Sequence, residues 1–439
     1  MEAGTGSLRR ARVGPELWLP ACVAVVVAGT FAYGLAARAS GVRLGASLAP
    51  LLAGWSPVLR PSAIPAVLVL GAAVAAAPAL RSRRVSPGAF AAAALGLGLA
   101  LRLGLGFARR GVEGLYAVYE IGENEAANEY LPALPAFEFG TRFFLDTFAE
   151  IGASLPVHAI GPPPGLLVLM HWLGIDDAPG MAALTIGLGA LSVPLAYQLG
   201  RALLDEDRAR IATLLYVFAP SAVLYGATSA DALYATIGLL AAVPLALAVR
   251  RPAAAAAGAP ALAVASFLSY ANLALGAWAA LVAWQRAGLR RALAIAAVCA
   301  AGLLVFYAVL HFATGYNPVG VLRATESVYR EGIASRRPYA FWVLGSPSAF
   351  LVALGLPIAW LAVRAAATGD AVARALLAVL LIAAVLGFTK AETERIYLFL
   401  VPLACVAAAA VFPARRLPLV LGLLAVQALA TELLLYTVW

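Results

Sequence analysis

Long apolar runs, separated by short arginine-bearing segments, are the feature that most constrains this chain. A helix needs about 20 mainly apolar residues to cross the hydrocarbon core of a membrane. Of the 439 residues, 63% are hydrophobic and only 12% are charged, whereas soluble domains are about 25% charged. The pattern therefore predicts an all-α polytopic membrane protein.

Thirteen apolar segments are predicted to be membrane-spanning helices. They lie at about 17–38, 62–80, 88–107, 181–200, 211–228, 232–249, 253–270, 271–285, 292–313, 347–364, 371–388, 396–413 and 417–435. The first follows Arg9, Arg10 and Arg12, as the apolar core of a signal peptide would, but it is longer than the usual 7–15 residues of such a core. We therefore expect a retained first span.

The arginines between the spans predict an orientation, because cytoplasmic loops are enriched in positive charge. With the N-terminus inside, six clusters fall on the cytoplasmic side: Arg81/Arg83/Arg84, Arg201/Arg208/Arg210, Arg250/Arg251, Arg286/Arg290/Arg291, Arg364/Arg374 and Arg415/Arg416. The formal net charge of +9 is therefore interpreted as an orientation signal, and no nucleic-acid partner is expected.

The same topology leaves two long segments outside, a first loop at about 108–180 and a second at about 314–346. Within the first loop, residues 164–173 are apolar but too short to cross, which predicts an interfacial or re-entrant helix begun by prolines. Three regions are expected: N-terminal spans over 1–87, a core over 88–250 that includes the first loop, and C-terminal spans over 251–439. Long ordered loops between packed spans are common places for function.

Carboxylates are concentrated in the first loop, although the whole chain has only 22 acidic residues. They are Glu113, Glu120, Glu123, Glu125, Glu129, Glu138, Asp146 and Glu150. One interpretation is an ordinary solvated acidic loop. The other follows from the large apolar neighbours, which place parts of the loop against the membrane surface, where a partly desolvated carboxylate gains basicity and suits a general base.

The second loop carries Arg323, Arg330, Arg336 and Arg337 on the side where positive charge is scarce. Arg323, Glu326 and Arg330 share one helical face, which predicts either a salt-bridged amphipathic helix at the headgroups or an anion site, since arginine binds phosphate through two parallel hydrogen bonds.

The segment "GFTKAETERIYLFL" holds the only lysine of the chain, Lys390, at the predicted outer mouth of two spans. Arg395 follows it, with Glu392 and Glu394 between. The glutamates either neutralise these cations in a structural motif, or Lys390 and Arg395 bind a phosphate. Ionisable groups at such a depth are functional candidates.

Three histidines and one further aspartate complete the candidates. His171 is expected to have a packing or interfacial role in the short apolar helix, whereas His158 and His311 should face the outer boundary. Asp231, after Ser229, is an N-cap candidate or a site residue. No histidine pair has i, i+4 spacing, so no metal site is predicted, and a divalent metal is possible but not indicated.

The order of these features resembles the GT-C superfamily of membrane glycosyltransferases, the group that includes protein O-mannosyltransferases and lipid A aminoarabinose transferases. The similarity covers about residues 88–250 and rests on three segments. The stretch "ENEAANEY" offers Glu125 and Glu129 before Tyr130, the run Pro162–Pro164 stands at a His-Pro-Pro motif of the family, and Asp231 lies at the outer end of the corresponding span.

This resemblance implies transfer of a sugar from a polyprenyl-phosphate donor to a glycan, lipid or protein acceptor on the external face. It implies a carboxylate base in the first loop, either Glu129 or Glu125, and basic groups on the donor phosphate. Position and chemistry suggest Lys390, Arg395, Arg336 and Arg337 for the phosphate. The alternative is a multi-span transporter or lipid flippase, for which charges near mid-membrane would be expected. The alanine- and arginine-rich composition suggests a bacterial plasma membrane with the site facing outward.

Overall fold

The computed structural model describes residues 14–123 and 125–439, and it is almost entirely helical there. Arg9, Arg10 and Arg12, expected on the cytoplasmic side, lie outside the described residues. One short antiparallel pair joins β1 (Gly54–Trp55) to β2 (Leu435–Tyr436), with Gly54 opposite Tyr436. The expected all-α fold is thus confirmed.

The chain forms helices in each of the thirteen apolar segments and in both long loops. The α-helices are α1 (Pro15–Ala39), α2 (Ala63–Arg81), α3 (Pro87–Arg110), α4 (Gly140–Ile151), α5 (Val157–Ile160), α6 (Gly165–Leu173), α7 (Ala178–Ala190), α8 (Ser192–Leu203), α9 (Glu206–Phe218), α10 (Pro220–Thr228), α11 (Asp231–Ala248), α12 (Ala255–Leu268), α13 (Leu273–Ala287), α14 (Leu289–Thr314), α15 (Pro318–Glu331), α16 (Tyr339–Ala353), α17 (Leu356–Ala367), α18 (Ala371–Leu386), α19 (Thr393–Ile396), α20 (Val401–Ala410) and α21 (Leu417–Leu434).

The expected count of about thirteen membrane spans is not confirmed. Among the described residues, eight helices are long and apolar enough to cross a membrane, and two bent helix pairs raise the number to at most ten. Shorter apolar helices such as α18 fall below the required length. The hydropathy pattern located these apolar segments, but it does not show where a helix is bent or is too short to cross the membrane.

The segment expected as one span at 347–364 is the clearest such break. It is divided between α16 and α17, which meet at 114°. Gly355 lies at the corner with φ +104, and a Cβ there would meet the Leu424 side chain and Pro220. Only glycine adopts this backbone conformation readily. A smaller bend of 56° separates α9 from α10, where Pro220 starts the second helix.

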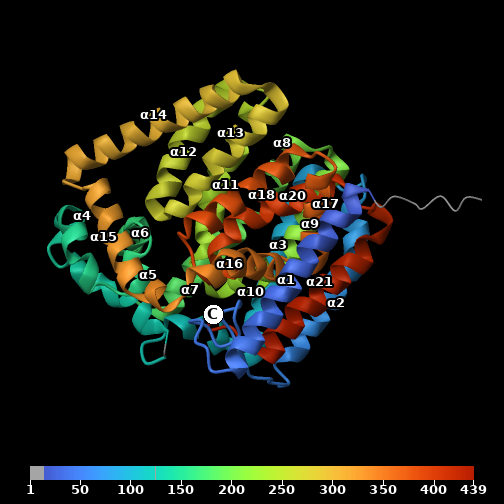
Figure 1. Ribbon diagram of the computed structural model, residues 1–439, viewed down its shortest axis with the longest axis horizontal. Coiled ribbons are helices and arrows are strands. Elements are labelled where there is room, and N and C mark those ends of the chain that lie inside the picture. Colours follow the sequence, from blue (N-terminus) through green and yellow to red (C-terminus); the bar gives the residue numbers. More distant parts are fainter. Residues whose placement is uncertain (1–13, 124) are drawn as a thin grey trace, which may run out of the picture.

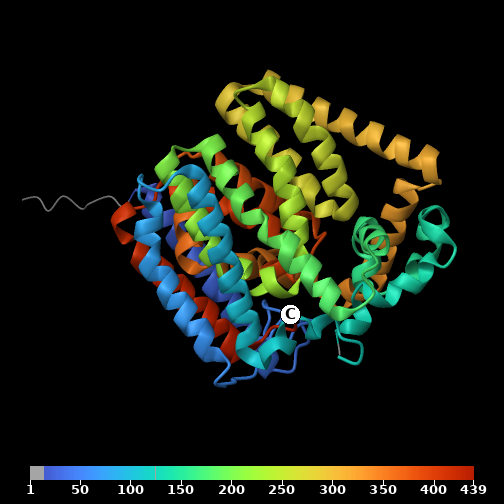
Figure 2. The ribbon, with the colours of Figure 1, turned by 180° about the vertical axis from the view of Figure 1, so that it is seen from behind.

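The most enclosed helices form the centre of the bundle. In the apolar window that contains α20, 89% of residues are buried, against 11% in α14. α14 runs along one edge beside α12 and α13, while α1, α2 and α21 lie together at the opposite side (Figures 1 and 2). Because α14 exposes large apolar side chains such as Leu304 and Phe312, we interpret it as lipid-facing.

Ion pairs join the loops that the sequence predicts to be cytoplasmic. Arg81 at the end of α2 lies 2.7 Å from Asp207 in α9, and Arg286 at the end of α13 lies 3.6 Å from Asp370 before α18. Segments from distant parts of the sequence thus meet in one layer. The first loop, Glu392 and the C-terminal end also meet, because Arg395 contacts both His158 and Glu392, and Trp439 donates to Glu129.

We predict that single cysteines on the two layers are labelled from opposite sides of the membrane. Ala153 and Ala287 are exposed neutral positions in the first loop and at the end of α13. In a Cys22→Ser background, a membrane-impermeant maleimide on intact cells should label Ala153→Cys, and Ala287→Cys only after permeabilisation. Labelling of both in intact cells would contradict the topology.

Candidate functional site

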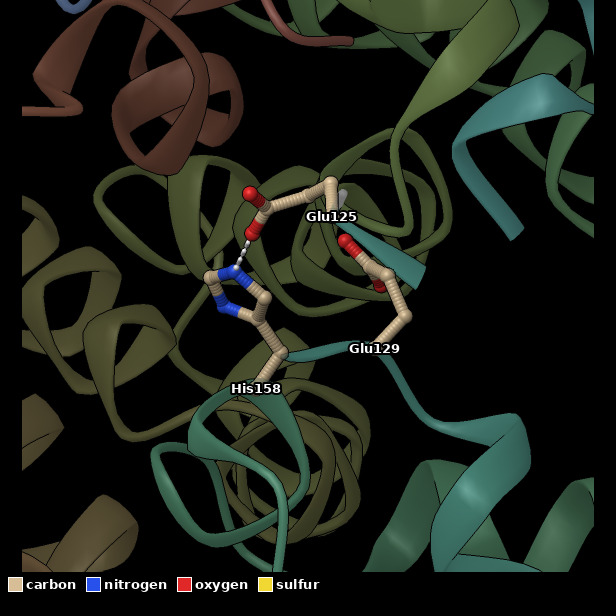
Figure 3. Close-up of side chains that lie close together, drawn as sticks. All are labelled: Glu125, Glu129 and His158. Carbon is tan, nitrogen blue, oxygen red and sulfur yellow. Dashed lines mark hydrogen bonds and ion pairs between the residues drawn. The ribbon is translucent and has the colours of Figure 1, made fainter. Parts of the chain in front are cut away.

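Two carboxylates and an imidazole from the first loop converge at one point. A single 3-10 turn, Ala126–Asn128, separates Glu125 from Glu129, and His158 lies on the one-turn helix α5, which begins after Pro156. One possible ligand atom from each of Glu125, Glu129 and His158 lies within 4.8 Å of the others. Figure 3 shows the three side chains directed toward a common centre, with His158 Nε2 hydrogen-bonded to Glu125 Oε1 at 3.0 Å.

Arg395 links this trio to the helical bundle. One guanidinium nitrogen, Nη1, donates to Asp231 Oδ2 at 2.6 Å. The other, Nη2, donates to Glu392 Oε2 at 2.6 Å and faces His158 Nδ1 at 3.3 Å. Arg395 is only 6% exposed, so these are charge-assisted bonds in a largely dry environment, where they are stronger than neutral ones.

The turn before α19 places Glu392 for this contact. Ala391 and Glu392 have φ of +66 and +61, a left-handed conformation that non-glycine residues rarely adopt and that persists only when surrounding contacts fix it. Those contacts are present: Arg337 Nη2 donates to Glu392 Oε1 at 2.7 Å and its Nη1 to the Lys390 carbonyl at 2.6 Å. Glu392 therefore bridges two buried guanidinium groups.

Trp439 covers the other side of the arrangement. Its indole Nε1 donates to Glu129 Oε1 at 3.0 Å, its ring lies 3.9 Å from Arg395 Cζ, and it meets the His158 ring edge-on at 5.7 Å between centroids. We call the group Glu125, Glu129, His158, Asp231, Arg337, Glu392 and Arg395 the outer charge cluster. Trp439 contacts it by a hydrogen bond and a cation–π interaction.

The environment shifts the protonation of the cluster. Burial raises the pKa of Glu129. Burial also opposes a charge on His158, but the Glu129 carboxylate and the bond to Glu125 outweigh it and raise the pKa of the imidazole. For Glu392, Arg395 and Arg337 outweigh burial and lower the pKa to about 2, so this carboxylate stays ionised at neutral pH.

The hydrogen bonds indicate where the protons lie. Arg395 can only donate, so His158 Nδ1 accepts, and the ring hydrogen belongs on Nε2, where it points at Glu125. Glu125 is the more exposed carboxylate of the trio, since its side chain is 21% exposed and Glu129 is 3% exposed.

A pocket opens beside the cluster, between the outer end of α3, the first loop and the C-terminal segment. Glu125 and Trp439 line it, and Glu129 is not among the described lining residues. Arg109 and Arg110 line the same pocket. Arg110 pairs with Glu123 at 3.0 Å in a partly exposed contact, whereas Arg109 donates to backbone oxygens such as that of Ser56 at 2.7 Å.

A second pocket adjoins the first and is largely apolar. Leu224 of α10 and Thr437 line both pockets. The second extends between α10, α16 and α21, with Leu51, Pro220 and Val352 among its lining residues. The two pockets together thus have a charged end at the loop layer and an apolar end between helices.

Two proposed phosphate ligands lie apart from the first pocket. The Lys390 ammonium donates to the Ala334 carbonyl at 3.2 Å, and Arg336 is exposed. Neither is among the described residues that line a pocket. Of the four basic residues suggested for a donor phosphate, only Arg395 and Arg337 belong to the outer charge cluster, and both are held there by carboxylates.

Three further candidates are placed outside the cluster. Tyr130 is buried and accepts a hydrogen bond from the Tyr234 hydroxyl at 2.9 Å. Asp146 is exposed on α4. His311 Nδ1 contacts the Tyr316 carbonyl at 2.9 Å, at the turn that ends α14. These contacts position loops and helix ends.

Some local expectations are confirmed and one is corrected. His171 is exposed and stacks on Phe137 with 4.3 Å between ring centroids, as the expected packing or interfacial role allows. Arg330 pairs with Glu326 on the exposed amphipathic helix α15 at 2.8 Å, as the salt-bridged alternative predicts. The N-cap role for Asp231 is wrong: it is the first residue of α11, and its carboxylate accepts from Ser229 Oγ and from Arg395.

Sequence reasoning missed Trp439, Arg109 and Arg102. No local pattern marks Trp439, because its partners are more than 40 residues distant. Arg109 and its neighbour Arg110 carried the same signal as the second-loop arginines, positive charge at an outer helix end. Arg102 interrupts an apolar helix; it is buried, and its Nη2 lies 3.2 Å from Ser192 Oγ, while its Nη1 has no hydrogen-bond partner among the described residues.

Glu125, Glu129 and His158 are also the one group in the described ranges whose atoms lie close enough to hold a metal ion. The search for i, i+4 histidines could not find it, since the three residues are brought together by the fold of the first loop. The expectation that a divalent metal is possible but not indicated stays a prediction.

Comparison with known proteins places the chain in no family. No protein-family model matches it, and neither the curated proteins nor the solved structures contain a match.

We predict that Arg395→Met destabilises the protein by about 3–5 kcal/mol, since it leaves the buried Asp231 carboxylate without its guanidinium partner and removes one of the two that Glu392 has. Arg330→Met, which removes an exposed ion pair, should cost at most about 1 kcal/mol. Unfolding of both variants in mixed micelles of increasing denaturing-detergent fraction measures the difference. Equal stability of the two variants would show that the Arg395 contacts do not hold the outer layer together.

Proposed function

We propose that this protein is an integral membrane glycosyltransferase that moves a sugar from a polyprenyl-phosphate-linked donor to an acceptor hydroxyl on the external face. The observation that carries the proposal is the pair of adjoining pockets. One is lined by Glu125 and two arginines, and the other is apolar and enters the helical bundle. A donor with a charged head and a lipid tail matches both ends.

Glu125 is the better choice for the general base. A base must reach the acceptor hydroxyl within hydrogen-bond distance, and Glu125 lines the pocket while Glu129 is 3% exposed behind it. The bond from His158 Nε2 fixes the position of the Glu125 carboxylate. Glu129 is held behind it by the indole of Trp439.

Arg110 is the proposed contact for the donor phosphate. It lines the pocket, and its pair with Glu123 is 36% and 42% exposed, so a phosphate could replace that carboxylate at little cost. Arg395 and Arg337 are engaged with buried carboxylates, and releasing them would leave charges unpaired. In this proposal they support the site and do not hold the phosphate.

The proposed reaction is a single displacement at the anomeric carbon. Glu125 takes the proton of the acceptor hydroxyl as its oxygen bonds to that carbon, and the bond from the carbon to the phosphate oxygen breaks. The leaving lipid phosphate keeps the electron pair, and the Arg110 guanidinium stabilises the charge as it develops. One displacement inverts the anomeric configuration.

The cellular setting is part of the same proposal. The resemblance to GT-C glycosyltransferases and the alanine- and arginine-rich composition favour a multi-pass protein of a bacterial plasma membrane, with its pockets facing outward and a role in the cell envelope. The sugar and the acceptor are left open.

Arg102 is the observation that favours transport instead. A buried guanidinium inside α3, without a carboxylate at salt-bridge distance among the described residues, is the kind of intramembrane charge found on substrate pathways. A flippase would move the polyprenyl-phosphate sugar and leave it unchanged, so product analysis separates the two functions.

We predict that Glu125→Gln lowers turnover of polyprenyl-phosphate sugars by about 100-fold or more, the usual contribution of a general base, with donor binding retained. The measurement is radiolabelled sugar transfer in nanodiscs, with Glu120→Gln, an exposed first-loop carboxylate, as the matched control. Full turnover by Glu125→Gln and by the double variant with Glu129→Gln would refute the assignment.

We predict in addition that Arg110→Gln weakens donor binding by about tenfold, whereas Lys390→Met leaves it unchanged, because a charge-assisted hydrogen bond is worth about 1.5–3 kcal/mol. Binding is measured by titration with polyprenyl phosphate in nanodiscs. Weaker binding in Lys390→Met alone would restore the lysine as the phosphate ligand.

A further inference from the structure

The outer charge cluster is unbalanced. It has four carboxylates, Glu125, Glu129, Asp231 and Glu392, against two guanidinium groups, and His158 adds no charge when neutral. Two negative charges remain. Apart from Glu125 the carboxylates are at most 6% exposed, and an uncompensated charge in such surroundings is costly. Protons or a bound cation must supply the balance.

The excess lies on one side of the cluster. Arg395 is bonded to Asp231 and Glu392, and Arg337 to Glu392. The two guanidinium groups therefore neutralise Asp231 and Glu392. Glu125 and Glu129 have no guanidinium at salt-bridge distance among the described residues. Figure 3 shows their carboxylates and the His158 ring facing the same point.

The donor atoms suit a metal ion. Two carboxylate oxygens and one imidazole nitrogen lie within 4.8 Å of one another, and a tetrahedral ion with bonds of about 2.1 Å needs its ligands about 3.4 Å apart. The His158–Glu125 distance is 3.0 Å already. Small side-chain rotations would bring the other ligand atoms to that separation. Trp439 fixes Oε1 of Glu129, while Oε2 accepts no hydrogen bond from the described residues and is therefore available to the ion.

We propose that Glu125, Glu129 and His158 bind one divalent cation of the Zn²⁺ or Mn²⁺ class at the edge of the first pocket. An imidazole with two carboxylates is typical of these ions, whereas Mg²⁺ prefers oxygen ligands and retained water. Three protein ligands leave a coordination position open toward the pocket, as in catalytic metal sites.

The hydrogen bond from Arg395 to His158 is the one contact that is incompatible with metal binding, and its geometry shows why it can break. Binding at His158 Nε2 moves the ring hydrogen to Nδ1, which Arg395 Nη2 now faces at 3.3 Å. That is the longest of the three Arg395 contacts, and the two bonds of 2.6 Å to carboxylates remain. Metal ligands must be deprotonated, so Glu129 and Glu125 bind the ion as carboxylates and offset its positive charge.

The role of the ion rests on the proposed function, but its binding does not. At the pocket edge the cation would act as a Lewis acid on an oxygen of the donor phosphate. Each carboxylate supplies one ligand atom, so Glu125 keeps a second oxygen for the acceptor hydroxyl.

The test measures binding of Zn²⁺ alone, without donor or acceptor. The full chain in nanodiscs is stripped with a chelator, titrated calorimetrically, and assayed for metal after desalting. We expect one Zn²⁺ per chain, not displaced by excess Mg²⁺. Glu129→Gln and His158→Ala should each weaken Zn²⁺ binding at least 100-fold. Trp439→Phe, which keeps an aromatic ring and loses the hydrogen bond to Glu129, should weaken it about tenfold. Glu123→Gln, a pocket carboxylate outside the trio, should bind as the wild type does.

Two results would overturn the proposal: no stoichiometric Zn²⁺ or Mn²⁺ on the wild-type chain, or equal affinity in Glu129→Gln, His158→Ala and the Glu123→Gln control. Monodisperse elution and an unchanged melting temperature establish that each variant is folded. Because metal content is measured apart from turnover, a chain that binds Zn²⁺ but transfers no sugar would remove the proposed function and leave the metal site.

Discussion

The buried guanidinium of Arg395 is the interaction on which the outer layer depends. It lies in α19 and contacts Glu392 just before that helix, Asp231 at the start of α11 and His158 in the first loop. Through Glu392 the connection continues to Arg337 in the second loop. Removing the arginine would leave Asp231 buried without a guanidinium partner and Glu392 with Arg337 alone, and that cost is what fixes the geometry of the candidate site.

The site is therefore built from two parts, enclosed helices beneath it and loop segments over it. Its foundation is the pair of enclosed helices α11 and α20, whose surroundings are almost entirely apolar. Its cover is the first loop and the segment Leu435–Trp439, which is attached by the two-residue β1–β2 pair and by the indole of Trp439. Left-handed backbone at Ala391 and Glu392 is tolerated because charge-assisted bonds hold it. A lipid-linked substrate would meet this layer where it adjoins the bundle.

The sequence predicted the helical segments and the position of the long loops well, because both follow from hydropathy and arginine distribution. It singled out "TKAETER" and proposed Lys390 and Arg395 together as phosphate ligands, but in the structure Arg395 is paired with buried carboxylates and Lys390 donates to a backbone carbonyl. Depth of burial decides between them, and burial depends on which distant helices surround a residue. The corner at Gly355 and the contacts of Trp439 were missed for the same reason, since both depend on partners far away in the sequence. The Glu125–Glu129–His158 trio required the fold of the first loop, which periodicity does not encode.

In the proposed function, a lipid-linked phosphate binds across the two adjoining pockets, with its head beside Glu125 and Arg110 and its tail between α10 and α21. The most direct measurement is photo-crosslinking with a polyprenyl phosphate that carries a diazirine near the phosphate or along the tail, followed by mass-spectrometric mapping. We predict head-group labels on residues 106–125 and 436–439, and tail labels on α10, α16 and α21. Labels confined to the lipid-facing surface of α14, with none on the pocket residues, would contradict the account.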